Sequence, residues 1–164
     1  MNGKVRKGRK MRKRLIIGMS GASGAPFTIE LLKQLQQYKE IIETHLIVTK
    51  GAEMTLEQET DYTLEQLYAF ADEVHDNYNI GAGPASGSYR TMGMIVIPCS
   101  MKTLAGIVSG YSDNLVLRAA DITLKERRKK MSLPENGLSR YGNLSNNRCL
   151  CWQEYIMIIW KRNS

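Results

Sequence analysis

Two glycine- and hydroxyl-rich segments carry the residue types that bind a phosphate group. Residues 18–25 read Gly-Met-Ser-Gly-Ala-Ser-Gly-Ala, and residues 98–103 read Pro-Cys-Ser-Met-Lys-Thr. Glycines let the backbone approach a ligand, and the start of a following helix offers free N–H groups and a positive dipole end. Both segments therefore predict an anion site. Glycine packing in the first segment, and helix capping by Ser100 and Thr103 in the second, are the alternative interpretations.

The first segment matches neither of two common nucleotide-binding motifs. No Gly-Lys-Ser/Thr follows it, which excludes a Walker A loop, and its glycines do not have the Gly-x-Gly-x-x-Gly spacing of dinucleotide enzymes. Those enzymes also need an acidic residue at the end of the second strand, where Thr49 stands. A mononucleotide therefore fits this segment better than NAD.

A succession of strands and helices must position these segments. Compact apolar runs predict strands at 14–20, 44–49 and 93–98. Helices are expected at 26–38, where Pro26 suits a first turn, and at 52–59, 63–71, 104–109 and 113–130. This order predicts an α/β fold, a three-layer α/β/α domain with a Rossmann- or flavodoxin-like parallel sheet. Both glycine- and hydroxyl-rich segments would then lie at the carboxyl edge of the sheet, where ligands bind.

The histidines and cysteines give weaker signals. We expect His45 on a strand and His75 in a connection, each in a structural role. Cys99 is interpreted as a small buried residue, because neither histidine stands beside it. Cys149-x-Cys151 lacks a second pair of ligands, so no metal site is predicted.

Composition limits the classes of protein. The chain has 164 residues, of which 43% are hydrophobic, and this suffices for one domain with its own core. The net charge is +7, but residues 1–14 hold eight of the 23 Lys and Arg, and residues 15–128 hold nine basic against fourteen acidic groups. Basicity confined to the ends predicts no nucleic-acid partner. Apolar stretches far shorter than the ~20 residues of a membrane span predict a cytoplasmic protein without a membrane partner.

Several motifs together resemble one known family. They are the segment at 18–25, Glu-Thr-His-Leu-Ile-Val-Thr-Lys at 43–50, Ile-Pro-Cys-Ser-Met-Lys-Thr-Leu-Ala-Gly at 97–106, and the helix from Arg118 to Arg128. In order and spacing they resemble the UbiX-type flavin prenyltransferases, in the branch known as the small subunit of aromatic-acid decarboxylases. The resemblance runs from about Arg14 to Arg128.

The resemblance implies an FMN-binding domain. Such enzymes join the dimethylallyl group of dimethylallyl phosphate to N5 and C6 of reduced FMN, without a metal, and the product is the cofactor of a UbiD-type decarboxylase. Relatives form homo-oligomers with sites at subunit contacts. Two other functions stay open: an FMN-binding subunit of a decarboxylase system without its own turnover, and a simple FMN-dependent redox protein.

The resemblance also assigns residues. It implies Glu59 as the catalytic carboxylate with Ser23 beside it, although the sequence alone favours a solvated helix end for Glu57 and Glu59. Lys125 and Arg118 would hold the substrate phosphate. The flavin-binding positions would be Gly21, Ala22, Ser23, Thr49, Ser100, Met101, Lys102 and Thr103.

The two ends of the chain depart from this pattern. We expect residues 1–13 to be a disordered basic extension, residues 14–130 to be the FMN-binding domain and residues 131–164 to be an atypical tail. The tail lacks the Arg-Glu-Thr-Pro-Leu motif of the family, and Ile156–Trp160 is its single strand candidate. Our hypothesis is a frameshifted or truncated reading frame, which resequencing of the gene would test.

Overall fold

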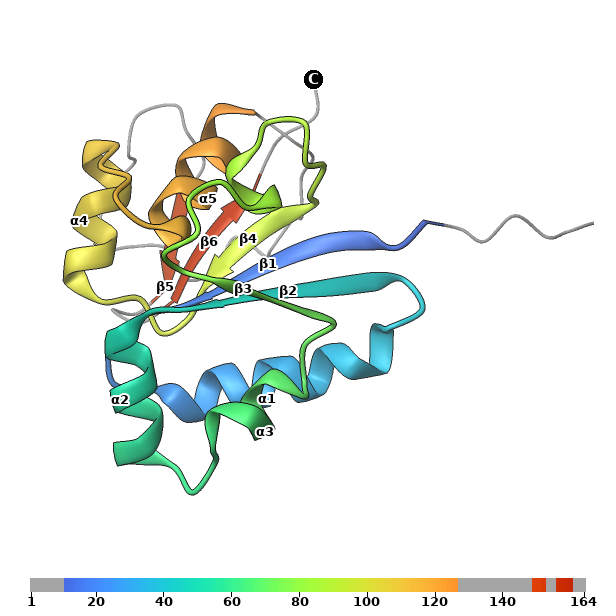
Figure 1. Cartoon of the computed structure of the whole chain (residues 1–164), viewed down its shortest axis with the longest axis vertical. Helices are drawn as coiled ribbons and strands as arrows, with labels where there is room; N and C mark the ends of the chain where they lie inside the picture. The colour runs from blue at the N-terminus through green and yellow to red at the C-terminus, as the bar shows by residue number, and fades with distance from the viewer. Residues whose placement is uncertain (1–10, 127–148, 153–155, 161–164) are drawn as a thin grey trace, which may run out of the picture.

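The computed structural model describes residues 11–126, 149–152 and 156–160, which form one six-stranded sheet with helices on both faces (Figure 1). The strands are β1 (Lys13–Met19), β2 (Ile42–Val48), β3 (Glu73–Asp76), β4 (Gly93–Val96), β5 (Cys149–Trp152) and β6 (Ile156–Trp160). The helices are α1 (Ala25–Leu35), η1 (Gln36–Tyr38), α2 (Lys50–Glu59), α3 (Leu64–Tyr68), η2 (Gly83–Ala85), α4 (Met101–Ser109) and α5 (Leu115–Lys125).

The sheet has the order β3-β2-β1-β4-β6-β5. Strands β1, β2 and β4 are parallel, as predicted, and β3, which was not predicted, is parallel to β2. Strand β6 runs antiparallel to β4, and β5 runs antiparallel to β6. The strand expected at Ile156–Trp160 is therefore present as β6. The sequence did not predict β5, because a run of four residues is too short to show a periodic pattern.

Alternate residues of β1 separate two apolar layers. Leu15, Ile17 and Met19 belong to a cluster with side chains of α1, α2 and α3. Ile16 belongs to a second cluster with side chains of α4 and α5 on the other face. Figure 1 shows the same division, with α1 and α3 on one side of the sheet and α4 and α5 on the other. The three-layer α/β/α fold class is confirmed.

Capping residues fix the starts of the helices, and α2 and α4 begin two and three residues before the expected positions 52 and 104. Gly24 precedes α1 with a φ of 115°, a left-handed conformation that favours glycine, and Pro26 follows in the first turn. Side-chain oxygen atoms cap three helices: Thr49 caps α2, Ser100 caps α4 and Asn114 caps α5. Each oxygen accepts a hydrogen bond from a backbone N–H group in the first turn of its helix. The caps of α2 and α4 start these helices close to the ends of β2 and β4, whereas α5 follows α4.

Strand β3 corrects one prediction. His75 lies on this strand, paired in parallel with β2, and not in a connection. The sequence Glu-Val-His-Asp has no apolar run, and it becomes a strand because the free edge of β2 supplies its hydrogen-bond partners.

The ordered domain also begins before residue 14. Lys13 is the first residue of β1, and the Arg12 guanidinium donates to Asp72 over 2.7 Å. The predicted extension over residues 1–13 therefore ends too late, because these two basic residues have partners inside the domain. Residues 1–10 and most of the predicted tail lie outside the described residues.

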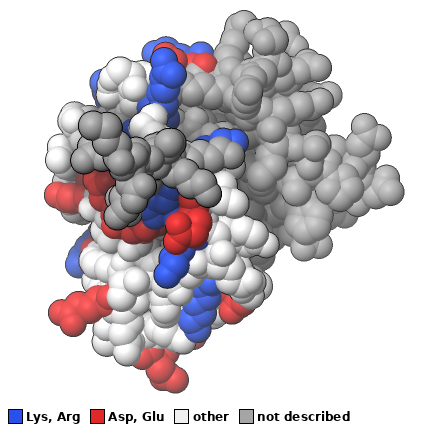
Figure 2. Space-filling model, turned by 90° about the vertical axis from the view of Figure 1, so that its right-hand side faces the viewer, with Lys and Arg blue, Asp and Glu red and all other residues white. Residues whose placement is uncertain are grey.

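The surface charge and the helix lengths of the described residues can be read from the structure. Figure 2 shows basic and acidic side chains interspersed over the described part of one face. Among the helices that the structure describes, none combines the length and the apolar character that a membrane crossing requires.

Candidate functional site

Backbone hydrogen bonds hold together the carboxyl ends of three neighbouring parallel strands. The N–H of Thr49, after β2, donates to the carbonyl of Met19 at the end of β1 over 3.0 Å. The N–H of Ser20 donates to the carbonyl of Pro98, after β4, over 3.1 Å. The starts of α1, α2 and α4 therefore meet at one edge of the sheet (Figure 1).

Ser20 is the central polar side chain of this edge. Its side chain is fully buried, its hydroxyl donates to the Pro98 carbonyl over 2.8 Å, and it accepts from the N–H of Ser100 over 2.7 Å. One hydroxyl thus joins the loop after β1 to the loop after β4. The sequence pattern did not single out Ser20, although it stands inside the segment 18–25.

A close backbone contact joins the loop after β1 to the start of α2. A Cβ atom built on Gly21 would lie 2.8 Å from the carbonyl carbon and the Cα of Gly51. Real Cβ atoms do not approach backbone so closely, so glycine at position 21 is a requirement of the packing. No motif in the sequence pointed to Gly51, because its role depends on a contact between two segments that are distant in the chain.

Glu59, the last residue of α2, reaches the start of α1. Its Oε2 accepts from the N–H of Gly24 over 2.8 Å and from the N–H of Ala25 over 2.9 Å. Hydrogen bonds from the Ser23 side chain and from these amides lower the pKa of Glu59. The carboxylate therefore stays ionised at neutral pH and is oriented by fixed donors.

The start of α4 carries the second predicted segment. The Ser100 hydroxyl accepts from the N–H of Thr103 over 3.2 Å and donates to its hydroxyl over 3.0 Å, so the alternative interpretation of helix capping is correct for this pair. The first-turn N–H groups of Met101 and Lys102 have no acceptor within the helix. Both side chains are exposed, whereas Thr103 is buried. The N–H groups of Met101 and Lys102 and the ammonium group of Lys102 are therefore the donors that α4 offers at this edge of the sheet.

The two predicted phosphate-binding cations lie on α5, and Lys125 is at the end of the helix that faces away from the carboxyl edge of the sheet. The N–H of Leu115, at the start of α5, donates to the carbonyl of Asn77 just beyond β3, and the helix then runs about 15 Å toward the amino ends of the strands. Arg118 is exposed one turn into the helix, and Lys125 is exposed at its far end, 3.5 Å from Asp121. One copy of the chain therefore does not bring Lys125 to the loops that hold Ser23 and Ser100.

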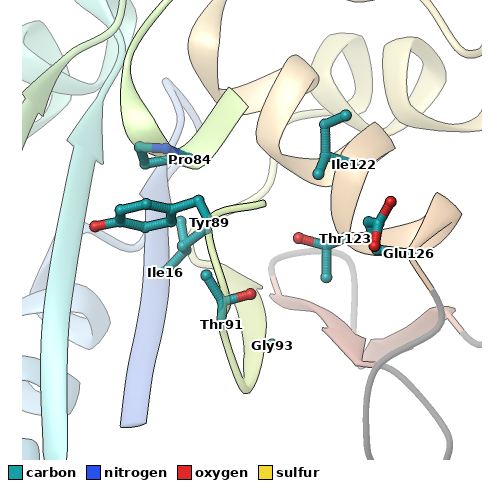
Figure 3. A pocket seen from close by; sticks show the side chains of 8 residues that line it. All are labelled: Ile16, Pro84, Tyr89, Thr91, Gly93, Ile122, Thr123 and Glu126. Carbon is teal, nitrogen blue, oxygen red and sulfur yellow. The ribbon is translucent and has the colours of Figure 1, made fainter. Parts of the chain in front are cut away.

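A small pocket lies at the far end of α5 (Figure 3). It is lined by Tyr89 and Thr91, by Gly93 at the amino end of β4, and by Thr123 and Glu126 on the helix, among others. None of the residues predicted for the flavin or phosphate site lines it. This pocket is therefore separate from the loops at the carboxyl ends of the strands.

A polar cluster on β2 and β3 was not predicted from the sequence. His45 and His75 stack with ring centroids 5.3 Å apart, and Glu73 lies beside both. Burial lowers the pKa of each imidazole, against the opposite effect of the Glu73 carboxylate. Two Glu-x-His segments, at 43–45 and 73–75, were the signal in the sequence that could have revealed it.

Comparisons with known proteins show which proteins this chain is similar to. The profile of the Flavoprotein family matches residues 4–148. The chain is 52% identical over 116 residues to the flavin prenyltransferase UbiX of Escherichia coli (strain K12), covering 71% of this chain and 61% of that protein. It is 53% identical over 136 residues to the flavin prenyltransferase UbiX of Neisseria meningitidis serogroup B, covering 83% of this chain and 71% of that protein.

Two solved structures share the fold. The crystal structure of AnUbiX (PadA1) in complex with FMN and dimethylallyl pyrophosphate gives a TM-score of 0.70 at 48% identity, covering 72% of this chain and 62% of that one. The dodecameric FMN-dependent UbiX-like decarboxylase from Escherichia coli O157:H7 gives a TM-score of 0.68 at 49% identity, covering 74% and 69%. The chain spans about three fifths of the length of the E. coli K12 relative. The length of the family match and the identity to the Neisseria protein show that the chain belongs to the Flavoprotein family and, within it, to the UbiX-type flavin prenyltransferases.

Proposed function

We propose that this chain binds FMN at the carboxyl edge of its sheet and transfers a dimethylallyl group from dimethylallyl phosphate to the reduced flavin. The observation that carries the proposal is the junction at Ser20, which ties the loops after β1 and β4 together beside the oriented Glu59 carboxylate. Similarity to UbiX proteins, one of them solved with FMN and a dimethylallyl compound, supports the same assignment.

The residues at this edge fit a flavin mononucleotide. An FMN phosphate needs fixed donors, and the free first-turn amides of Met101 and Lys102, with the Lys102 ammonium, would provide them. The N-terminus of α1 is not available for that purpose, because Glu59 already accepts from Gly24 and Ala25. The phosphate is therefore assigned to α4, and the loops at 21–23 and 49 would hold the rest of the flavin.

Glu59 has the role of an ionised, immobile carboxylate in this proposal. Bound reduced FMN supplies the nucleophilic N5 and C6 atoms. Joining the dimethylallyl group to N5 would release the phosphate and the N5 proton, and joining it to C6 would add a proton to its double bond and remove the proton at C6. A carboxylate held by Ser23 and two amides would take up and return such a proton. Hydrogen bonds that lower the pKa of Glu59 also limit its strength as a base, so its charge would further stabilise positive charge on the allyl group as the phosphate leaves.

Arg118 and Lys125 are assigned to the leaving phosphate of the allylic substrate. Fixed cations stabilise the negative charge that develops on a departing phosphate. Because Lys125 lies at the opposite end of α5 from the sheet edge, we propose that a second copy of the chain supplies it. The dodecameric state of one relative is consistent with a site shared between copies.

The direct test is a single-turnover assay. The purified chain is incubated anaerobically with reduced FMN and either dimethylallyl phosphate or dimethylallyl pyrophosphate, and the flavin is analysed by mass spectrometry. A flavin heavier by one dimethylallyl group in place of a hydrogen is the expected product. Bound FMN without that product would instead favour a flavin-binding subunit without turnover, and reduction of bound FMN by NAD(P)H would favour a redox protein.

Two further assignments accompany this function as proposals. The prenylated flavin would pass to a UbiD-type decarboxylase, and the chain would act in the cytoplasm. Transfer is testable by mixing the reacted chain with an apo-decarboxylase of that type and measuring release of CO₂ from an aromatic acid.

A further inference from the structure

Two Glu-x-His segments lie side by side on β2 and β3. Glu43 and His45 stand two positions apart on β2, and Glu73 and His75 do so on β3, so each pair shares one face of the sheet. The register places His45 opposite Glu73 and Ile47 opposite His75. The Glu-x-His segment of β3 is therefore shifted along the sheet by two residues relative to that of β2. This offset brings two imidazoles and one carboxylate together.

The distances between their polar atoms match the edges of a metal-coordination shell. His45 Nδ1 lies 3.0 Å from His75 Nε2 and 3.4 Å from Glu73 Oε2, and His75 Nε2 lies 3.6 Å from Glu73 Oε1. Two ligand atoms about 2.1 Å from a tetrahedral zinc ion stand about 3.4 Å apart. One ligand atom from each of the three residues lies within 4.8 Å of the other two, so small rotations of side chains suffice.

A second carboxylate orients one of the imidazoles. Glu43 Oε1 lies 3.1 Å from His45 Nε2, where it accepts that ring's N–H and leaves the lone pair of Nδ1 directed toward His75 and Glu73. Carboxylates in this position are common behind metal-bound histidines, where they fix the tautomer and orient the ring.

Burial gives the cluster a closed side and an open side. The side chain of His45 is fully buried and that of His75 is 8% exposed, whereas that of Glu73 is 52% exposed and gives access from solvent. The Tyr89 hydroxyl lies 2.9 Å from His45 Nδ1, close enough to donate to it in the metal-free protein. The guanidinium of Arg14 lies over the Tyr89 ring at 4.4 Å and opposes, but does not block, a cation here.

We propose that His45 Nδ1, His75 Nε2 and the Glu73 carboxylate form a site for a divalent transition-metal ion of the zinc class, with water or the Tyr89 hydroxyl as a fourth ligand. Two nitrogens and one carboxylate select zinc, cobalt or nickel over magnesium. The ion would link the edge strand β3 to β2, because its ligands come from both strands. The site lies on a different part of the molecule from the loops assigned to FMN, so it does not depend on the proposed transferase activity.

The test measures metal binding by the full chain with any purification tag removed, with and without FMN. Binding of Zn²⁺ and Co²⁺ is followed by competition with a chromophoric chelator and by thermal unfolding. We expect one ion per chain, a rise in Tm with Zn²⁺ but not with Mg²⁺, and cobalt absorption bands without the intense thiolate-to-cobalt transitions. Because the chain has two histidines, ¹⁵N-histidine NMR should show Zn²⁺ shifting Nδ1 of one ring and Nε2 of the other.

Variants decide whether these residues are the ligands. Loss of a residue that hydrogen-bonds to a metal ligand typically weakens metal binding by 10–100-fold, and we expect an effect in that range for Glu43→Gln. His75→Ala and Glu73→Gln remove ligands and should weaken Zn²⁺ binding by more than that. Glu57→Gln, a matched change of an exposed glutamate on α2, should have no effect. Because Glu73 is half exposed, its variant should fold even where a histidine variant does not.

Each of the following outcomes would overturn the proposal. They are unchanged Zn²⁺ affinity in Glu73→Gln, histidine ring signals that do not move with bound Zn²⁺, and loss of binding only when Cys149 and Cys151 are both changed to serine. Absence of Zn²⁺ binding at micromolar concentrations would overturn it equally.

Discussion

The hydroxyl of Ser20 accepts a hydrogen bond from the backbone N–H of Ser100 over 2.7 Å, and so joins two loops that lie 80 positions apart in the chain. The same hydroxyl donates to the carbonyl of Pro98. A single buried side chain therefore joins the two glycine- and hydroxyl-rich segments of the sequence.

Replacing that side chain should loosen the site. In Ser20→Ala the N–H of Ser100 and the Pro98 carbonyl each lose a buried partner, which costs about 1–3 kcal/mol in the free energy of unfolding. Urea denaturation measures this change, and FMN affinity should fall with it. Ser86→Ala is the control, because its exposed hydroxyl bonds to the exposed Ser88 and its loss should change stability by no more than about 0.5 kcal/mol. Equal stability of the two variants would contradict this role.

A side chain at position 21 should separate the loops to which we assign the flavin. In Gly21→Val the Cβ would lie 2.8 Å from the Gly51 backbone, so the start of α2 must shift and FMN affinity should fall at least about tenfold, a change of about 1.4 kcal/mol. Fluorescence titration of FMN checks this. Gly81→Ala is the matched control, since its Cβ would meet only Asn79 Oδ1 at an ordinary 3.6 Å.

The charge of Glu59 should matter to the reaction more than to flavin binding. Glu59→Gln keeps the size of the side chain and removes its charge, so we expect prenyl transfer to slow by about 10²–10⁴-fold while FMN remains bound. Because hydrogen bonds lower the pKa of Glu59, wild-type activity should not fall as the pH drops from 7 to 5 through loss of this carboxylate. Glu57→Gln, on the same helix, should retain full activity; a Glu59→Gln variant that is equally active would remove Glu59 from the mechanism.

Acid should destabilise the domain through Asp72. Burial raises the pKa of this carboxyl, but hydrogen bonds from the Thr44 N–H and the Arg12 guanidinium outweigh it and lower the pKa overall. A group with a lowered folded pKa contributes stability that is present above its unfolded pKa of about 3.9 and is lost as the pH falls through the folded value.

Asp72→Asn should therefore cost about 1 kcal/mol at pH 7 and remove part of the acid dependence below pH 4. Chemical denaturation at a series of pH values measures both effects. Asp61→Asn, at an exposed position, serves as the comparison and should follow the wild-type curve. An acid dependence that persists unchanged in Asp72→Asn would show that other groups cause it.

Two inactive variants should restore each other if copies of the chain share a site. Lys125→Ala and Glu59→Gln are each expected to lose prenyl transfer, but mixed oligomers would contain sites with Glu59 from one copy and Lys125 from another. Co-expression of the two variants and a single-turnover assay test this. Activity no higher than the sum of the separate variants would place both residues in the site of one copy.

The sequence indicated the fold where its residues form long or capped elements. The apolar runs of β1, β2 and β4 led to the correct layers, and Ser100 caps α4 as one interpretation of the sequence expected. Strands β3 and β5 were missed, because four residues next to an existing strand edge become ordered through pairing and not through a pattern of their own.

The contacts within the site were less predictable than its place. Glycine at 21 was expected to serve a ligand, but its packing requirement comes from Gly51, and no local pattern relates the two. The sequence favoured a solvated helix end for Glu59. The residue is indeed exposed at the end of α2, but its carboxylate also accepts from Gly24 and Ala25, which the sequence does not reveal. The assembly of Glu73 with His45 and His75 likewise depends on the register of two strands, which a single sequence does not specify.

The most direct measurement of the central claim is an equilibrium titration of the purified chain with FMN, followed by the bound flavin spectrum after excess FMN is removed. The account predicts one FMN per chain, with binding weakened in Gly21→Val and in Ser20→Ala but unchanged in Gly81→Ala. A folded chain that retains no FMN, or one whose FMN affinity is unaffected by both loop substitutions, would contradict a flavin site at this edge of the sheet.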